Sequence, residues 1–207
     1  RGFWLYVPAT ILPGLGRSAC FVLQIQPQSV EKVRAWGFLC AGRVGATWIG
    51  PRLTNYLDGS ICAFEKDDGT WTFGDSLVTL LDLLSVWVIR QLYVESYGRW
   101  PGPQASSYPY ERLFEFQDME HCGCREPKGR YSQCCKPYDL TYKPLAIACE
   151  HITLCTWRIR QAPAAVVNLI LYGRPPCGMD MEASVKDSQG ENPSPYTQNR
   201  ERQKCPK

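Results

Sequence analysis

The chain has 207 residues, of which 44% are hydrophobic and 21% charged, a balance that suits one globular domain with an appendage and excludes a disordered protein. Its 17 glycines and 16 prolines are too few for a collagen-like or low-complexity chain. The formal net charge is only +3 and no basic cluster stands out, so we expect no nucleic-acid partner.

The compartment follows from the apolar segments and the cysteines. Asp82 and Arg90 interrupt the most apolar stretch, residues 77–94, which favours a buried helix over a membrane span and predicts no membrane partner. No basic segment followed by an apolar run marks a secretory signal. The cysteine count is 11, and four of them are packed into residues 122–135. The odd total and the close packing of these four cysteines favour a reducing, cytoplasmic setting with a metal site over a secreted disulfide scaffold.

Short apolar runs separated by turn residues fill residues 3–48 and predict a β-meander. Phe21, Leu23 and Ile25 alternate with their neighbours, so their side chains share one face of a strand. This alternation predicts an antiparallel sheet with one buried face.

An irregular segment and a long helix follow the meander. Between residues 49 and 72 the periodicity fails and glycine, proline and Asp-Gly mark an ordered loop of the kind that carries function. Asp75 or Ser76 can then cap a helix that runs to about residue 97, where Gly98 ends it. Apolar side chains surround most of this helix, so we expect it to be largely buried in the centre of the core.

The second half of the chain is less regular. Residues 100–104, with the sequence WPGPQ, are expected to be extended and to mark the boundary after the long helix. Alternating apolar positions predict one or two strands over residues 152–159, and residues 164–172 predict a short helix. The expected organisation is a core in residues 1–104, a Cys-rich region with the C-terminal part of the fold in residues 105–180, and a flexible tail in residues 181–207.

One motif in the irregular segment indicates a candidate catalytic site. The run Gly59-Ser60-Ile61-Cys62, followed by Trp71 and the long helix, resembles the active-site segment of ubiquitin-conjugating enzymes. In that family His-Pro-Asn precedes Gly-x-Ile-Cys by a few residues. Asn55 stands where the family has its Asn, while Leu53 and Thr54 replace the His and Pro, and the Asn-to-Cys interval is one residue shorter.

The resemblance covers roughly residues 3–97 and looks closest to divergent bacterial members, whose genes accompany cGAS-like nucleotidyltransferases in type II CBASS antiphage operons. It implies an α+β fold, an antiparallel β-meander packed on helices. It also implies a transferase that carries a C-terminal-glycine donor, the cGAS-like nucleotidyltransferase, as a thioester on Cys62 and passes it to a lysine. The Asn55 amide would stabilise the oxyanion. Since no phosphate-cradling glycine motif is present, activation of the donor falls to a separate activating enzyme or another partner.

Other interpretations of these residues stay open. Cys62 fits a small buried hydrophobe, and Asn55 fits a turn residue before Asp-Gly. A catalytically inactive ubiquitin-conjugating-like scaffold or zinc-binding adaptor is the alternative to a transferase. A cysteine hydrolase that pairs Cys62 with His151 is the third possibility.

Four cysteines form the second constellation. Cys122 and Cys124, one residue apart, and the adjacent Cys134 and Cys135 supply four thiolates that suit tetrahedral, structural Zn²⁺. The segment resembles a SEC-C type zinc motif, with a spacer one residue longer than usual. Unligated thiols and disulfides are the alternatives. Four further residues offer substitute ligands: His121, Cys149, His151 and Cys155. The last three also fit a separate weak metal site or alternating positions of a strand.

Overall fold

The computed structural model describes most of the chain as two compact units, one formed by Arg1–Gln91 with Ile159–Gly190 and the other by Leu92–Arg158 with Glu191–Lys207. The described residues are 3–12, 17–25, 33–40, 46–55, 58–64, 69–106, 108–124, 129–155 and 160–172. The tail expected over residues 181–207 lies outside them. The fold class is α+β, as the sequence predicts.

The first unit is built on a four-stranded antiparallel meander in the order β1-β2-β3-β4. Its strands are β1 (Phe3–Leu12), β2 (Arg17–Ile25), β3 (Val33–Cys40) and β4 (Ala46–Trp48). The predicted meander is therefore confirmed.

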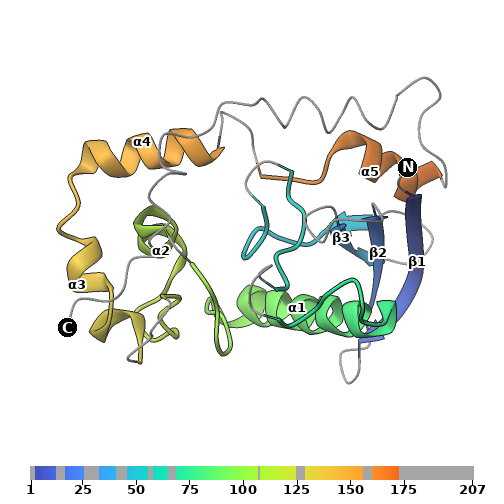
Figure 1. Cartoon of the computed structure of the whole chain (residues 1–207), viewed down its shortest axis with the longest axis horizontal. Helices are drawn as coiled ribbons and strands as arrows, with labels where there is room; N and C mark the ends of the chain where they lie inside the picture. The colour runs from blue at the N-terminus through green and yellow to red at the C-terminus, as the bar shows by residue number, and fades with distance from the viewer. Residues whose placement is uncertain are drawn as a thin grey trace. The chain divides into compact units, whose positions relative to one another are not determined.

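Both faces of the central strand β2 are buried, so the prediction of a single buried face is wrong. Phe21 and Leu23 on one side, and Cys20 and Val22 on the other, are all at most 1% exposed. Helix α5 (Ala164–Tyr172) covers the second side, and Figure 1 shows the sheet between α5 and the long helix α1 (Leu77–Tyr97). Alternation along a strand cannot reveal this arrangement, because the side chains on both faces are apolar.

Helix α1 begins and ends near the predicted positions. The Ser76 hydroxyl accepts the N–H of Val78 at 3.1 Å and so caps the helix, whereas the Asp75 carboxylate accepts the N–H of Thr72 at 2.7 Å. At the other end, the N–H of Gly98 donates to the Val94 carbonyl at 2.7 Å.

The burial of α1 differs from the prediction. Leu80, Leu84 and Val88 are at most 1% exposed, but Val78 and Val86 on the other side are 65% and 46% exposed. By length and composition alone α1 could cross a membrane, but this buried stripe makes it a core helix of the first unit.

The second unit is held by short helices around the Cys-rich loops. They are α2 (Pro109–Glu115), the 3-10 turn η2 (Tyr131–Gln133), α3 (Lys136–Asp139) and α4 (Pro144–Cys155). The strand predicted to start near residue 152 is wrong, because Ile152 belongs to α4; residues 156–159 lie outside the described residues. The alternating apolar positions in this segment are too few to distinguish a strand from a helix. The helix predicted over residues 164–172 is confirmed as α5.

Candidate functional site

Cys62 lies on a two-stranded turn that follows β4. Thr54 and Ile61 form an isolated antiparallel bridge, and the N–H of Cys62 donates to the Leu53 carbonyl at 2.9 Å. One step further, the N–H of Asn55 donates to the Ser60 carbonyl at 2.7 Å. Backbone bonds of Cys62 and of the residues directly before it therefore fix the position of Cys62.

This turn is anchored to the sheet and to α1. The N–H of Ile61 donates to the Ala35 carbonyl of β3 at 2.7 Å. From α1, the indole N–H of Trp87 donates to the Leu53 carbonyl at 3.2 Å, and the Gln91 amide donates to the carbonyl of Arg52. Because the Ala35 carbonyl belongs to a buried strand and the two side-chain donors to a buried helix face, the turn is anchored in the first unit although its sequence is irregular.

Asp58 organises the tip of the turn. Its carboxylate accepts the N–H and hydroxyl of Ser60, at 3.0 and 2.7 Å, and forms an ion pair with Arg34. Its carbonyl accepts the indole N–H of Trp36 at 2.8 Å. Gly59 has φ of 65°, and a Cβ there would lie 2.6 Å from the carbonyl carbon of Gln161, so only glycine fits.

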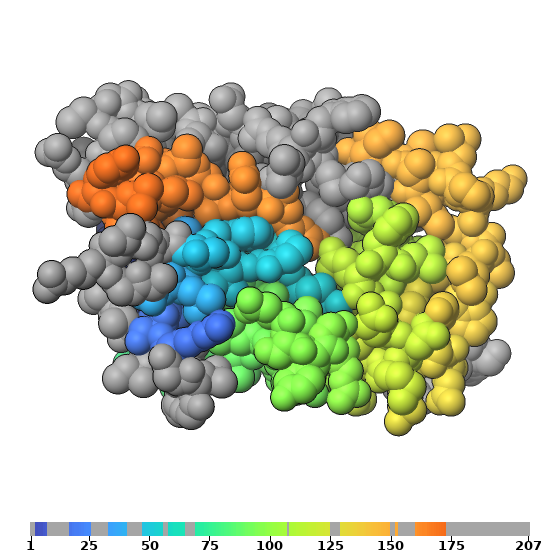
Figure 2. Space-filling model, turned by 180° about the vertical axis from the view of Figure 1, so that it is seen from behind, coloured from blue at the N-terminus to red at the C-terminus, as the bar shows by residue number. Residues whose placement is uncertain are grey.

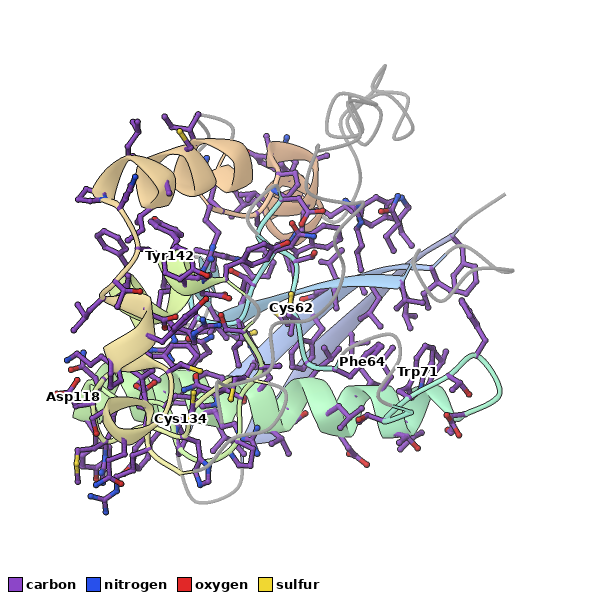
Figure 3. The ribbon with its side chains drawn as sticks, turned by 60° about the vertical axis from the view of Figure 1, so that its left-hand side comes forward. Cys62, Phe64, Trp71, Asp118, Cys134 and Tyr142 are labelled. Atoms are coloured by element: carbon purple, nitrogen blue, oxygen red, sulfur yellow. The ribbon has the colours of Figure 1, made fainter. Side chains whose placement is uncertain are left out.

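The Cys62 side chain is exposed. The interpretation of this residue as a small buried hydrophobe is therefore wrong. Beyond it, the ring centroid of Phe64 lies 5.7 Å from that of the buried Trp71, which in turn lies 5.6 Å from Phe73. Figure 3 shows Cys62 on the loop that leads to Phe64 and Trp71 beside α1.

Asn55 and Cys62 are diagonal neighbours in the turn. Asn55 pairs with Ser60, two residues before Cys62, which makes Asn55 and Cys62 diagonal neighbours along the backbone of the turn. Leu53, the residue opposite Cys62, has φ of 49°, so the ladder departs from a regular pleat at this point. The half-buried Asn55 also accepts the N–H of Gly59 through its carbonyl at 2.9 Å, so it has a role in the turn as well.

The four cysteines of the second constellation come together in the second unit. The Sγ atoms of Cys122, Cys124, Cys134 and Cys135 all lie within 4.8 Å of one another, and those of Cys124 and Cys134 are 3.7 Å apart. Sulfurs bound at about 2.3 Å to a tetrahedral zinc lie about 3.8 Å apart. The cluster can therefore hold a metal ion, and its geometry is compatible with zinc.

The backbone brings the two cysteine pairs together. His121 and Arg130 form an antiparallel bridge between them, and the N–H of Cys122 donates to the Gly129 carbonyl at 3.0 Å. Gly123 is needed between the first two cysteines, since a Cβ there would lie 2.8 Å from the backbone nitrogen of Ser106. The longer spacer thus still permits a closed cluster. In Figure 3, Cys134 lies among the grouped yellow sulfur atoms.

The cysteines of the cluster are reduced thiols. None of the eight cysteines whose side chains the structure describes forms a disulfide, so the disulfide alternative is wrong for these four. Burial raises the pKa of the Cys122 thiol to about 11. A metal ion bound here would replace thiol protons, as thiolate coordination requires.

A buried ion pair that the sequence does not reveal supports the cluster. Asp139, fully buried, accepts two N–H bonds from Arg112 at 2.6 and 2.8 Å and the hydroxyl of Tyr131 at 3.1 Å. Burial alone would lower the pKa of Arg112, but the bonds and charge of Asp139 outweigh it and raise that pKa. Since Asp139 is one turn after Cys135, the pair fixes the second cysteine pair against α2.

Replacing Arg112 by methionine is expected to destabilise the second unit by about 3–5 kcal/mol, because it leaves the Asp139 carboxylate buried without its cation. Urea unfolding followed by circular dichroism measures this loss. The exposed Arg130 is the matched control, and Arg130→Met should change the free energy of unfolding by less than about 0.5 kcal/mol. Equal effects of the two substitutions would contradict the role given to Arg112.

Two further candidate ligands have described side chains, and neither belongs to the four-thiol cluster. His121 is exposed, and Cys149 is exposed on α4. Cys149, His151 and Cys155 belong to a helix, so their interpretation as strand positions is wrong. The side chains of His151 and Cys155 are outside the described residues, and the separate weak site and the pairing of His151 with Cys62 stay predictions.

No family model matches the chain, and no curated protein or solved structure matches it either.

Proposed function

We propose that the protein is a ubiquitin-conjugating-type transferase that carries a C-terminal-glycine donor as a thioester on Cys62 and transfers it to a lysine. The observation that supports this most is the placement of Cys62, exposed at the end of a turn whose backbone is hydrogen-bonded up to Cys62 itself. A thiol that exchanges acyl groups must be reachable, and a fixed backbone orients it toward its partner. The order of meander, Cys62, Trp71 and long helix agrees with a ubiquitin-conjugating-like fold.

The proposed reaction has two balanced steps. The Cys62 thiolate attacks the activated carbonyl of the donor's terminal glycine, a C–S bond forms and the activating group leaves with its electron pair. A neutral lysine amine then attacks the thioester, the C–N bond forms, Cys62 leaves as the thiolate and the amine proton passes to solvent. Neither step needs a histidine base, in keeping with a chain that has only 2 histidines.

The donor in this proposal is a cGAS-like nucleotidyltransferase, activated by a separate enzyme, in a cytoplasmic antiphage defence system. No nucleic acid and no membrane take part. The four-cysteine cluster holds a structural Zn²⁺, since four thiolates leave no open position for a reacting water.

The direct test is incubation of the protein with such a nucleotidyltransferase, its activating enzyme and ATP. A non-reducing gel should show an adduct that disappears on addition of a thiol. Absence of any adduct, with the partners shown to be active, would contradict the transferase.

Replacing Asn55 by alanine is expected to slow discharge of the thioester to an amine about a hundredfold, and loading much less. As the amine attacks, negative charge grows on the thioester oxygen, and one lost oxyanion donor costs about 2.7–4 kcal/mol of barrier. Loading draws on donors of the activating enzyme, whereas discharge depends on this chain. Single-turnover discharge measures the effect.

Thermal unfolding is the control for Asn55, whose backbone also stabilises the turn. If loading and discharge fall together with the melting temperature, Asn55 is a turn residue and has no catalytic role. Asn55→Asp is the companion variant, because it keeps the size of the side chain but removes its donor.

An inactive scaffold or zinc-binding adaptor is the second candidate, and the conformation of Leu53 favours it. Leu53 replaces the family's histidine and has φ of 49°, a strained value for a bulky side chain, so the loop differs locally from the family pattern. A scaffold would still bind its partner but would form no thiol-sensitive adduct in the same gel.

A further inference from the structure

The outward face of α1 carries exposed apolar side chains. Val78, Val86 and Ile89 are 65%, 46% and 38% exposed, although the opposite side of the same helix packs in the core. In Figure 2 the atoms of α1, coloured green, reach the molecular surface. Exposed apolar side chains on one face of a helix, here with the exposed Asp82 between Val78 and Val86, form a surface that another molecule can cover.

Two opposite charges lie on this face, one before and one after Val86. Successive residues of a helix are turned by about 100°, so Asp82 and Arg90, four residues before and after Val86, lie about 40° to either side of it. Each is also about 6 Å from Val86 along the helix axis, in opposite directions. Asp82 is exposed and Arg90 half-buried. When this helix face is turned by 180° about Val86, Asp82 takes the place of Arg90 and Arg90 that of Asp82. The face is therefore complementary in charge to the same face of a second copy.

We propose that this face of α1 pairs with the same face of a second copy of the chain, antiparallel, about a twofold axis at Val86. Val86 then contacts Val86 of the second copy, and each Asp82 lies opposite Arg90 of the other copy. A twofold contact must be self-complementary, and the antiparallel pairing brings both charge pairs together at once. Helices that pack in this way have axes 8–10 Å apart, within reach of both charged side chains.

A lipid surface is the other occupant that an apolar helix face suggests, and the charges disfavour it. Helices that lie on membranes carry Lys and Arg along the polar flank of the apolar face. Here the flanks carry one acid and one base, and Asp82 would be repelled by anionic lipid. The same two charges are attractive in the antiparallel pair.

The test is sedimentation equilibrium of the full chain over a range of concentrations. Wild-type protein should pass from 23.5 kDa to twice that mass as the concentration rises. Asp82→Arg places two like-charged pairs in the dimer, and so does Arg90→Asp. Each variant alone should associate at least about a hundredfold more weakly than the wild type.

The decisive arm is an equimolar mixture of the two variants. In the mixed dimer both contacts again join opposite charges, so the mixture should recover the dimer mass that neither variant reaches alone. Glu95→Lys is the control, because residue 95 is turned about 180° from Val86 and should leave the wild-type association unchanged. Circular dichroism verifies that each variant is folded, and Val86→Glu is a further variant that should be monomeric.

Three outcomes would overturn the proposal. They are a wild-type protein that stays at the monomer mass throughout, single variants that associate as the wild type does, and a mixture of the two variants that remains monomeric. Co-sedimentation of the wild type with phosphatidylserine vesicles, lost in Val86→Glu, would assign the face to a lipid surface instead.

Discussion

Replacing Cys62 by alanine is expected to abolish the thiol-sensitive adduct with the donor protein completely. The sulfur of the proposed thioester belongs to this side chain, and alanine offers no atom that can form the covalent bond. Cys62→Ser should instead accumulate an adduct that resists thiol, since an oxygen ester is less reactive toward thiols than a thioester. Gels run with and without reductant measure both results.

The control for Cys62 is another exposed cysteine of the same chain. Cys149 is exposed on α4, so Cys149→Ala should leave adduct formation unchanged. Both variants should unfold at the wild-type temperature, because an exposed side chain contributes little to packing. An adduct that persists in Cys62→Ala would assign the nucleophile to a different residue.

Removal of the zinc proposed for the four-cysteine cluster is expected to unfold the Cys-rich part of the second unit. Structural zinc contributes about 10–16 kcal/mol of apparent binding free energy in small zinc-binding peptides, and the four thiols here form the centre of a small core. Elemental analysis should find one zinc per chain, and substitution by cobalt should give the absorption of a four-thiolate site. Chelation should expose Tyr131, now 1% exposed, to solvent.

The control for the metal site is the same set of measurements on Cys149→Ser, which should keep the full zinc content. Cys134→Ser should lose most of the metal. Metal-free protein that remains folded, with all four thiols of the cluster reacting freely, would contradict the zinc site.

How much of the molecule the sequence predicts depends on how far apart the partners lie along the chain. The meander, the ends of α1 and helix α5 follow from turn residues, caps and apolar spacing, which act within a few residues. The Gly59-Ser60-Ile61-Cys62 run and the two cysteine pairs are also local patterns. These patterns are sufficient to single out Cys62 and all four cysteines of the cluster as candidate site residues.

The tertiary structure decided which faces are covered and which distant groups meet. The apolar pattern of α1 predicts a buried helix, yet only the sheet-facing side is buried, because no described element covers Val78 and Val86. Burial of both faces of β2 required α5, more than 100 residues later in the chain, to pack on the same sheet.

The buried ion pair is the plainest case of what only packing determines. Arg112 and Asp139 are 27 residues apart, and each alone is an ordinary charged residue in a polar stretch of sequence. Their meeting depends on how α2 and α3 pack around the cysteine cluster, a long-range relation that no periodicity encodes. The sequence by itself therefore determined the reactive groups and the local elements, while the fold determined the surroundings that stabilise them, because burial depends on neighbours that are distant along the chain.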